Sequence, residues 1–598
     1  MYNYKATSPE ETIRLIRRIL DKVGINTEVT HFKYNNYLYS CRVNITNGEL
    51  RKYNLGCNGK GISQEYALAS GYAELMERIQ NHVIGYEGQK YAVEQFQRKQ
   101  LFSKLPFQEK IGCPLKYFLF PDENVVLQDS QKVQDLLAYI YPETQNHEVP
   151  KGLNGKSFCI LYADMYNLTS GKVSQMPIEL MRYLSDSTGM CSGNNTAEAI
   201  LQGLCEICER YILQQIYLKK VRFPIYEIYN LPTETRNLLM SLNKDGYDFK
   251  VFNCSLGGKF PVLGLLVEKV YKNRRLYSFR LGSDLNPDVA LKRCVTEIFQ
   301  GVNINDEISL WEEKKDYYAI YEYQKSLVNG SGLVPLEVFD FSQSSNVYFD
   351  MVDISSRNAS LLSVLEHFKR NGIEFWVRDN SFLDFPAYYV YSPQLSPVSD
   401  LLRPQVPFVY YQICTDTFFN INPKYHICDN LTQLEKEQLC IFLEMNIGKE
   451  LMLHPYRMKG DGNSYNAFLL LMAYKLAIGM YNEVLNMVEI AHDYIYMDEQ
   501  YYYALKTALG LAANGCPEHI IRSNIVSLCD IETVSDIIAD LFMKNHSLTN
   551  YQNLNLYNLF IEDSVYSDWI KVQEKISNIS LAKKIEQEKI MATILQSD

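Results

Sequence analysis

Three segments of the chain place polar side chains in the same row along what we predict to be helices. The polar residues recur at positions i, i+4 and i+7: Ser70, Glu74 and Glu77; Gln202, Glu206 and Glu209; Arg293, Glu297 and Gln300. At about 100° per residue, each triplet lies within an arc of roughly 60°. The residues around each row are apolar, which is typical of helices buried inside a protein rather than lying on its surface.

These rows have two interpretations. In the first, they are ordinary helix-surface ion pairs of the i,i+4 type, which stabilise a helix by only about 0.2–0.5 kcal/mol each. The pairs are Glu74 with Arg78, Glu206 with Arg210, and Arg293 with Glu297. That interpretation suffices for one helix, but it leaves Glu77, Glu198 and Glu209 without a partner on their own helices. A buried carboxylate without a cation costs several kcal/mol, and a donor set of oxygens alone suits Mg²⁺ bound together with phosphate groups. The second interpretation, which we favour, is a metal and phosphate site.

Composition limits the other classes of function. The 598 residues, 47% of them hydrophobic and 22% charged, suffice for more than one globular domain. The formal net charge of −11 and the absence of a dense Lys/Arg stripe argue against direct binding to nucleic acid or an anionic membrane. The first residues lack the pattern of a secretory signal, and the apolar stretch 468–480 is interrupted by Lys475 and is too short to span a bilayer. We therefore expect a cytoplasmic protein whose 14 cysteines are reduced.

The first 400 residues predict a mixture of helices and strands. Ser8-Pro9-Glu10-Glu11 begins a helix that ends at Gly24. A strand at 37–46, a turn at Asn47-Gly48 and a return strand at 50–56 predict a hairpin, followed by a polar loop and a helix from about 64 to 83. Strands at 260–267 and 277–282 belong to later alternation of strands and helices. The expected fold is an α+β or mixed α/β core over residues 1–410.

After about residue 410 the strand pattern gives way to successive helices of about 12–16 residues with short turns near Gly479 and Gly515. Helical hairpins with Ala, Leu and Tyr at the packing positions resemble tetratricopeptide repeats, although the period does not establish a repeat. We expect an all-α, tetratricopeptide-like domain over residues 411–598.

Three other motifs carry less weight. The segment GCNGKGIS (56–63) lacks the spacing of a P-loop. Two interpretations stay open: its backbone amides and Lys60 bind an anion, or its glycines only make a turn. Cys205-x-x-Cys208 lies inside a predicted helix without a second such pair, so we interpret both thiols as packing residues. Cys516-x-x-His519 lacks further metal ligands.

Longer stretches resemble a known family. NGKGISQEYALASGYAELMER, GMCSGNNTAEAILQGLCEICERY and ALKRCVTEIFQ are similar to the three nucleotide-binding signatures of the YcaO family, and the first contains its S-x-x-x-E-x-x-E-R motif. The similarity to the founding member extends through NCSLGGKFPV (253–262), SPVSDL (396–401) and the helical C-terminal region. The resemblance implies an ATP site without a P-loop, in which glutamates of several helices hold Mg²⁺ against the triphosphate.

The resemblance also assigns residues by matching position. It implies direct or water-mediated metal ligands at Glu74, Glu77, Glu198, Glu206, Glu209 and Glu297. It implies contacts to phosphate or sugar from Ser70, Asn194, Arg210 and Arg293. It places Lys5 and Thr12 toward the nucleoside, although Thr12 stands where the family has Ser. Gln300 is followed by Gly301-Val302 instead of Gly-Arg, and no catalytic base is identified.

Two activities agree with the resemblance. Family members use ATP to phosphorylate a peptide amide oxygen, which leads to azolines or thioamides, whereas the founding subgroup assists methylthiolation of a small-subunit ribosomal protein. The implied partners are a peptide or protein substrate, a ribosomal protein or a modification enzyme, and a second copy in a homodimer. The azoline-forming branch ends in a Pro-x-Pro-x-Pro tail, but here Lys583 to Leu595 predicts a helix followed by a frayed polar end. We therefore expect any general base to come from the core.

Overall fold

The computed structural model describes most of the N-terminal two thirds of the chain and parts of the remainder. The described residues are 6–34, 37–48, 51, 55–81, 83–84, 121–141, 157–272, 274–302, 308–312, 322–323, 325–327, 330, 332–349, 356–398, 450–451, 465–466, 472, 475–476, 479–494, 499–543, 572 and 575–596.

The N-terminal elements form a three-stranded antiparallel sheet, ordered β1-β2-β3, that is covered by helices. They are α1 (Pro9–Val23), β1 (Thr27–Lys33), β2 (Tyr39–Ile45), β3 (Gly56–Gly61) and α2 (Gln64–Gln80). The start of α1 is confirmed as a capping box: Ser8 Oγ accepts from the Glu11 amide, and the Glu11 carboxylate accepts from the Ser8 amide. Gly24 ends α1 with a φ of 80°.

The polar loop expected at 57–63 is wrong for most of its length, because Gly56–Gly61 is strand β3 paired with β2. Its glycines are explained by close packing rather than by a turn. A Cβ at Gly59 would lie 2.0 Å from the carbonyl oxygen of Ala67 on α2 and 2.4 Å from the amide nitrogen of Gly71. The absence of side chains lets α2 lie directly on β3. Most of the return strand expected at 50–56 falls outside the described residues.

Two larger sheets follow. The first has the order β12-β11-β10-β9-β8-β13. Its strands are β8 (Phe223–Ile225), β9 (Asp248–Asn253), β10 (Val262–Tyr271), β11 (Arg274–Ser283), β12 (Trp311–Glu312) and β13 (Phe339–Ser344). The second has the order β4-β5-β14-β15-β7, with β6 also paired to β5. Its strands are β4 (Asn124–Asp129), β5 (Ser157–Asn167), β6 (Lys172–Met176), β7 (Met190–Ser192), β14 (Trp376–Asp379) and β15 (Ala387–Tyr391). The associated helices are α4 (Ser130–Ile140), α5 (Ile178–Ser185), α7 (Thr233–Lys244), α8 (Pro287–Ile298) and α10 (Arg357–Arg370).

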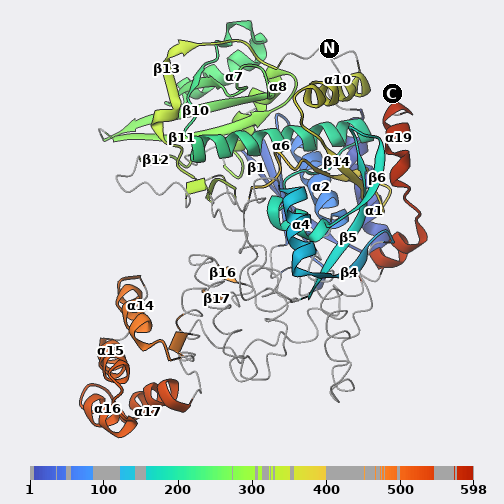
Figure 1. Ribbon diagram of the computed structural model, residues 1–598. Helices are drawn as coiled ribbons and strands as arrows, with labels where there is room; N and C mark the ends of the chain where they lie inside the picture. The colour runs from blue at the N-terminus through green and yellow to red at the C-terminus, as the bar shows by residue number, and fades with distance from the viewer. Residues whose placement is uncertain are drawn as a thin grey trace.

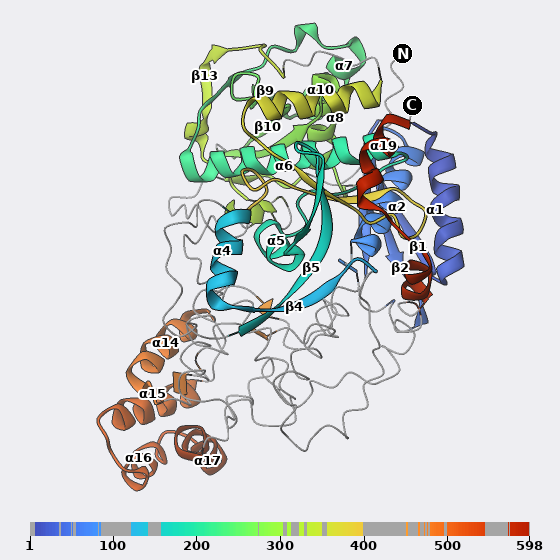
Figure 2. The same ribbon diagram turned by 45° about the vertical axis from the view of Figure 1, so that its right-hand side comes forward.

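Helix α6 (Thr196–Lys219) is the central element of the core. It contacts β10 and β11 of the first sheet and β7 and β15 of the second, and it runs between these two parts of the molecule in Figures 1 and 2. Ile200, Leu204 and Ile216 are buried in the largest hydrophobic cluster, which also contains residues of both sheets. The expected mixture of helices and sheets in the core is confirmed.

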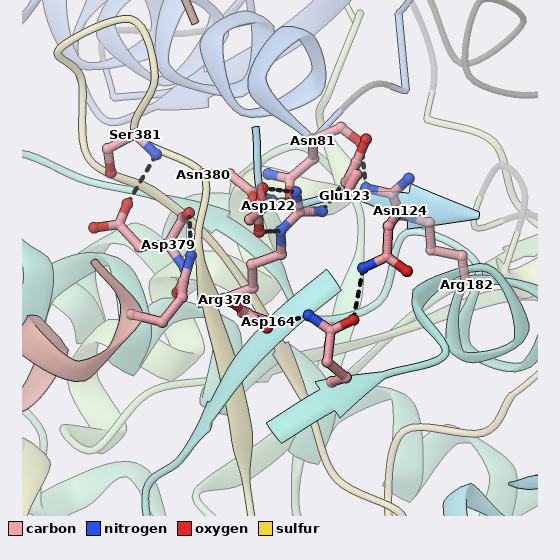
Figure 3. A network of polar contacts seen from close by, with 12 residues as sticks. Asn81, Asp122, Glu123, Asn124, Asp164, Arg182, Arg378, Asp379, Asn380 and Ser381 are labelled. Carbon is pink, nitrogen blue, oxygen red and sulfur yellow. Dashed lines mark hydrogen bonds and ion pairs between the residues drawn. The ribbon is translucent and has the colours of Figure 1, made fainter. Parts of the chain in front are cut away.

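A buried network of hydrogen bonds connects β14 to the segment before β4 (Figure 3). Arg378, which is 0% exposed, donates two hydrogen bonds of 2.9 and 2.8 Å to Asp122 and one of 2.8 Å to Glu123. Nearby, Asn380 donates to the side chain of Asn81, the residue that caps the end of α2. The network therefore joins α2, β4 and β14.

The C-terminal region is helical, as expected. Helices α14 (Tyr481–Tyr494), α15 (Glu499–Ala513), α16 (Glu518–Ile525) and α17 (Ile531–Ile538) pack on one another along the chain. Gly479 and Gly515 lie at turns with φ of 80° and 73°. A short pair of strands, β16 (Glu450–Leu451) and β17 (Tyr465–Asn466), interrupts the expected all-helical region. The division at residue 410 and the repeat class stay predictions.

The end of the chain returns to the core. Gln587 exchanges two hydrogen bonds with the backbone of Asp379, and Ile590 and Ile594 are buried in the largest hydrophobic cluster. The helix expected over 583–595 is shorter: residues 583–586 are not helical, η9 spans Gln587–Lys589 and α19 spans Ile590–Gln596. Burial of the two isoleucines fixes α19 against the core, whereas Gln587, which precedes α19, makes the Asp379 contacts.

Within the described residues, no helix is both long and apolar enough to cross a membrane.

Candidate functional site

Glutamates from three helices meet around Lys60 of β3. The charge of Glu77 on α2 interacts with that of Glu74 on the same helix and of Glu206 on α6, and Glu206 interacts in turn with Glu209. Lys60 lies near Glu209 and Glu74 and forms an ion pair with Glu297 of α8. We call Glu74, Glu77, Glu206, Glu209 and Glu297 the acidic cluster. The polar rows predicted on the three helices therefore converge at one site.

Close packing at two glycines, Gly59 and Gly203, produces this convergence. Gly59 lets α2 lie on β3, as described above. On the other side, a Cβ at Gly203 would lie 2.8 Å from Cys191 Sγ, so its absence lets α6 approach β7. Ser192 at the end of β7 donates a hydrogen bond of 2.9 Å to the carbonyl of Ala73 on α2. Strand β7 thus holds α2 and α6 at a fixed distance, and the glutamates of both helices face the same site.

Three carboxyl groups of the acidic cluster, those of Glu77, Glu206 and Glu209, are disfavoured in their ionised form. Burial raises the pKa of Glu77 well above its usual range, and the negative charges of Glu206 and Glu74 raise it further. Burial also raises the pKa of Glu206 and of Glu209, although Arg210 opposes both shifts. The Glu77 side chain is 8% exposed and that of Glu206 is 29% exposed, so the cluster is only partly open to solvent. Additional positive charge would therefore favour the ionised form of these three carboxyl groups.

Basic side chains partly compensate the acidic cluster. Arg78 lies 3.6 Å from Glu74 and 3.8 Å from Glu77, so a single guanidinium is shared by two carboxylates. Arg210 lies 4.0 Å from Glu206. These separations exceed those of good charge-assisted hydrogen bonds, which are about 2.7–2.9 Å. The guanidiniums therefore remain available to interact with an anion.

Arg293 has a partner that the sequence did not identify. Its guanidinium lies 3.5 Å from the carboxylate of Asp284, whose side chain is 6% exposed, instead of pairing only along its own helix. Asp284 follows β11 and comes just before the Asn286 cap of α8. An acidic residue at a strand end beside the third polar row is a sequence signal that could have indicated it.

A second group of predicted residues lies at the N-terminal end of α6. Asn194 accepts a hydrogen bond of 2.6 Å from Thr12 and donates one of 3.2 Å to Glu198, whose carboxylate also accepts from the Ala6 amide at 3.1 Å. Glu198 precedes Glu206 by eight residues, or about 12 Å along the helix. The structure thus brings Thr12, Asn194 and Glu198 together at a position displaced from the acidic cluster. Lys5 lies outside the described residues.

Ser70 lies half-buried on α2, one turn before Glu74. Its predicted contact with a ligand stays a prediction.

Buried thiols lie close to the acidic cluster. Burial raises the pKa of Cys57, Cys191 and Cys294 well above the usual range, and glutamates of the cluster contribute to each shift. Cys205 and Cys208 are 4% and 0% exposed, respectively, and neither forms a disulfide. Their burial agrees with a packing role, which stays a prediction. Burial raises the pKa of the three thiols near the cluster, which disfavours the nucleophilic thiolate.

The donor set fits Mg²⁺ held together with phosphate. Among the described residues, no group of three or more His, Cys, Asp or Glu side chains is arranged as a ready metal cage. Mg²⁺ is usually bound through one or two carboxylates plus phosphate oxygens and water, so it does not require such a cage. The raised pKa values of Glu77, Glu206 and Glu209 identify the place where additional positive charge stabilises the ionised site. The six-glutamate ligand set stays a prediction.

One family model matches more than half of the chain. A family described as "YcaO cyclodehydratase, ATP-ad Mg2+-binding" matches residues 58–396, more than half of the chain. This range includes the acidic cluster and all three polar rows.

Two curated proteins are similar to part of the chain. A Haemophilus influenzae protein called "Uncharacterized protein" is 25% identical over 360 residues, and "Ribosomal protein S12 methylthiotransferase accessory factor YcaO" of Escherichia coli is 23% identical over 360 residues. Each match covers 58% of this chain and 58% of the relative. The chain therefore matches little more than half the length of these relatives.

Solved structures give weaker matches. A "Heterocyclase in complex with substrate and Cofactor" is 17% identical with a TM-score of 0.45, over 65% of this chain and 53% of that chain. A YcaO structure from Methanopyrus kandleri "bound with AMPPCP and Mg2+" is 15% identical with a TM-score of 0.40, over 67% of this chain and 93% of that chain.

Proposed function

The chain belongs to the YcaO family, and we propose that its core binds ATP with Mg²⁺ at the acidic cluster and uses the nucleotide to activate a peptide or protein amide. The observation that carries this proposal is the convergence of carboxylates and arginines from α2, α6 and α8 at one partly exposed site. Acidic and basic groups side by side suit a ligand that consists of a metal cation and an anionic triphosphate.

The residues have complementary roles in this proposal. Glu77, Glu206 and Glu209 would hold Mg²⁺, with Glu74 and Glu297 as further ligands. Glu198, which is displaced from the acidic cluster, would serve a second Mg²⁺ ion. Arg210 and Arg293 bind phosphate oxygens, because both guanidiniums lie near Lys60 at the acidic cluster. Thr12 and Asn194, at the far end of the site, face the nucleoside with Lys5. The bound Mg²⁺ supplies positive charge against the charge that develops on the transferred phosphate.

Activation of an amide is the chemistry we infer. An amide oxygen is a poor leaving group, and transfer of the terminal phosphate of ATP to this oxygen, with release of ADP, converts it into a good one. A nucleophile then attacks the amide carbon, and the oxygen leaves as phosphate. A side-chain nucleophile of the substrate gives an azoline, whereas a sulfur donor gives a thioamide. Arg210 and Arg293 would offset negative charge on the phosphate during both steps.

One observation favours a second candidate, an accessory role for another enzyme. The Escherichia coli relative is described as an accessory factor of ribosomal protein S12 methylthiotransferase, and helices α14 to α17 lie beyond the residues that match the family. In this alternative the core still binds ATP, and the helices bind a partner protein that carries out the modification.

ATP turnover separates the two candidates. Purified full-length protein is assayed for ADP release with Mg²⁺, with and without cell extract, beside Glu209→Gln as the site control. Peptides that co-purify are examined by mass spectrometry for loss of water or exchange of oxygen for sulfur. An amide-activating enzyme turns over ATP and yields such a peptide, whereas an accessory factor needs the extract. No Glu209-dependent turnover under either condition would contradict both candidates.

A further inference from the structure

Lys60 lies where a metal ion is proposed to bind. We propose that Lys60 is the counter-ion of Glu297 in the metal-free protein. Because the metal competes with this ion pair, Lys60 couples metal binding to nucleotide binding. The inference rests on the proposed function and adds to it a residue with a defined role: Lys60 makes the site a poor receptor for the metal alone and a good one for metal and phosphate together.

The contact between Lys60 and Glu297 joins two distant segments. Lys60 is on β3 and Glu297 is on α8, and the two side chains form an ion pair across these elements. Their side chains are 33% and 35% exposed, so an ion from solvent can reach both. The ammonium group contacts one carboxylate oxygen, Glu297 Oε2, so a cation that binds this oxygen competes with Lys60.

The backbone on both sides of Lys60 cannot easily shift relative to α2. A Cβ at Gly59 would lie 2.0 Å from the Ala67 carbonyl oxygen, and a Cβ at Gly61 would lie 2.7 Å from the Ala67 amide nitrogen. Strand β3 is therefore pressed against α2 immediately before and after Lys60. The flexible side chain can move, but its Cα stays at the site.

The surroundings of Lys60 contain both signs of charge. Its ammonium interacts with the carboxylates of Glu209 and Glu74 and with the guanidiniums of Arg293 and Arg210. Each guanidinium also lies near another carboxylate: Arg293 lies 3.5 Å from Asp284, and Arg210 lies 4.0 Å from Glu206. Among the described residues, Lys60 is the group for which an ion pair with Glu297 is observed.

Two consequences follow for binding. A divalent ion that binds without nucleotide must compete with the ammonium for Glu297, and the displaced charge then repels it. When a triphosphate binds with the ion, the displaced ammonium has phosphate oxygens to accept its charge. Lys60 therefore opposes the first event and favours the second, which is a positive coupling free energy between the two ligands.

Binding of Mn²⁺ to the full-length protein, followed by electron paramagnetic resonance, tests this. Dissociation constants are measured with and without AMPPCP for the wild type, Lys60→Met and Lys60→Arg. Lys292→Met is the matched control, because Lys292 pairs with Asp288 at 3.0 Å on the same helix as Glu297 but outside the acidic cluster. Lys60→Met should tighten binding of Mn²⁺ alone by roughly two- to fivefold, the effect of losing one partly exposed ion pair. AMPPCP should then tighten Mn²⁺ binding by a correspondingly smaller factor.

Lys60→Arg and Lys292→Met should behave like the wild type. In a Glu297→Gln background, Lys60→Met should no longer tighten Mn²⁺ binding, because the carboxylate for which they compete is gone. Lys60→Gln repeats the measurement if the Met variant does not fold. Unchanged or weaker Mn²⁺ binding in a folded, uncharged Lys60 variant would overturn the inference alone. Absence of Mn²⁺ binding by the wild type even with AMPPCP would overturn the proposed function as well.

Discussion

Glu77 is the most buried glutamate of the acidic cluster. Its side chain is 8% exposed and shares Arg78 with Glu74. Because burial outweighs the attraction of Arg78, the pKa of Glu77 is raised in the folded protein. The folded state therefore binds a proton more readily than the unfolded chain. The resulting stabilisation is lost as the pH rises from about 4.3, the value of an unperturbed Glu, through the raised pKa.

Glu77→Gln should consequently make the metal-free protein more stable at neutral pH. Gln keeps the shape of the side chain and removes the charge, so the melting temperature in chelator should exceed that of the wild type at pH 7. The difference should shrink toward pH 4. Adding Mg²⁺ and ATP should stabilise the wild type more than the variant. A variant that is less stable than the wild type at pH 7 without metal would show that the ionised Glu77 is already compensated.

For Cys205 and Cys208 we predict that replacement lowers stability but leaves ATP turnover intact. Both thiols are buried in α6, so the double change to Ala should lower the free energy of unfolding by roughly 1–3 kcal/mol. ATP turnover by the folded variant should remain near that of the wild type. Denaturant titration and an ADP-release assay measure these two effects. Bound zinc in the wild type, together with loss of turnover in the variant, would contradict the packing role.

Some site residues could be predicted from the sequence and others could not. The polar rows at Glu74, Glu206 and Glu297 follow from helical periodicity alone. The pairing of Lys60 with Glu297 joins segments more than 200 residues apart in the sequence, and that of Arg293 with Asp284 depends on how α8 leaves β11. Periodicity within one helix holds no information about either contact.

At the scale of elements, the helices were predictable because their signals are local. The capping box at Ser8 and the apolar spacing after Gln64 lie within the elements they define. Strand β3 was missed because its three glycines are typical of a loop, whereas pairing with β2 and packing under α2 make it a strand. The return of α19 to the core was missed for the same reason, since its partners lie hundreds of residues earlier.

The C-terminal helix provides the prediction at this scale. Ile594 is 0% exposed, whereas the adjacent Leu595 is 61% exposed. Ile594→Ala should lower the free energy of unfolding by roughly 2–5 kcal/mol, and Leu595→Ala by no more than about 0.5 kcal/mol.

Deletion of 596–598 should leave ATP binding and turnover nearly unchanged, because we infer that any general base comes from the core. Loss of turnover in this deletion, with nucleotide affinity and folding intact, would make the tail catalytic.

At the scale of the whole molecule, the sequence predicted the class of fold but not the arrangement. Alternating strands and helices indicated a mixed core, yet the strand order β12-β11-β10-β9-β8-β13 depends on pairings between distant segments. The position of α6 between two sheets likewise follows from tertiary packing. This arrangement is what turns three separate polar rows into one site, and the proposed function depends on it.

Calorimetric titration of ATP into the full-length protein, with and without Mg²⁺, tests the central claim most directly. The wild type is compared with Glu77→Gln and Glu209→Gln. Glu65→Gln is the matched control, because Glu65 is exposed in the first turn of α2, the helix that carries Glu77. We predict that ATP binding requires Mg²⁺, weakens at least tenfold in both site variants, as for loss of a group that holds a metal, and is unchanged in the control. Wild-type affinity in both folded site variants would contradict the assignment of the acidic cluster as the Mg²⁺ and ATP site.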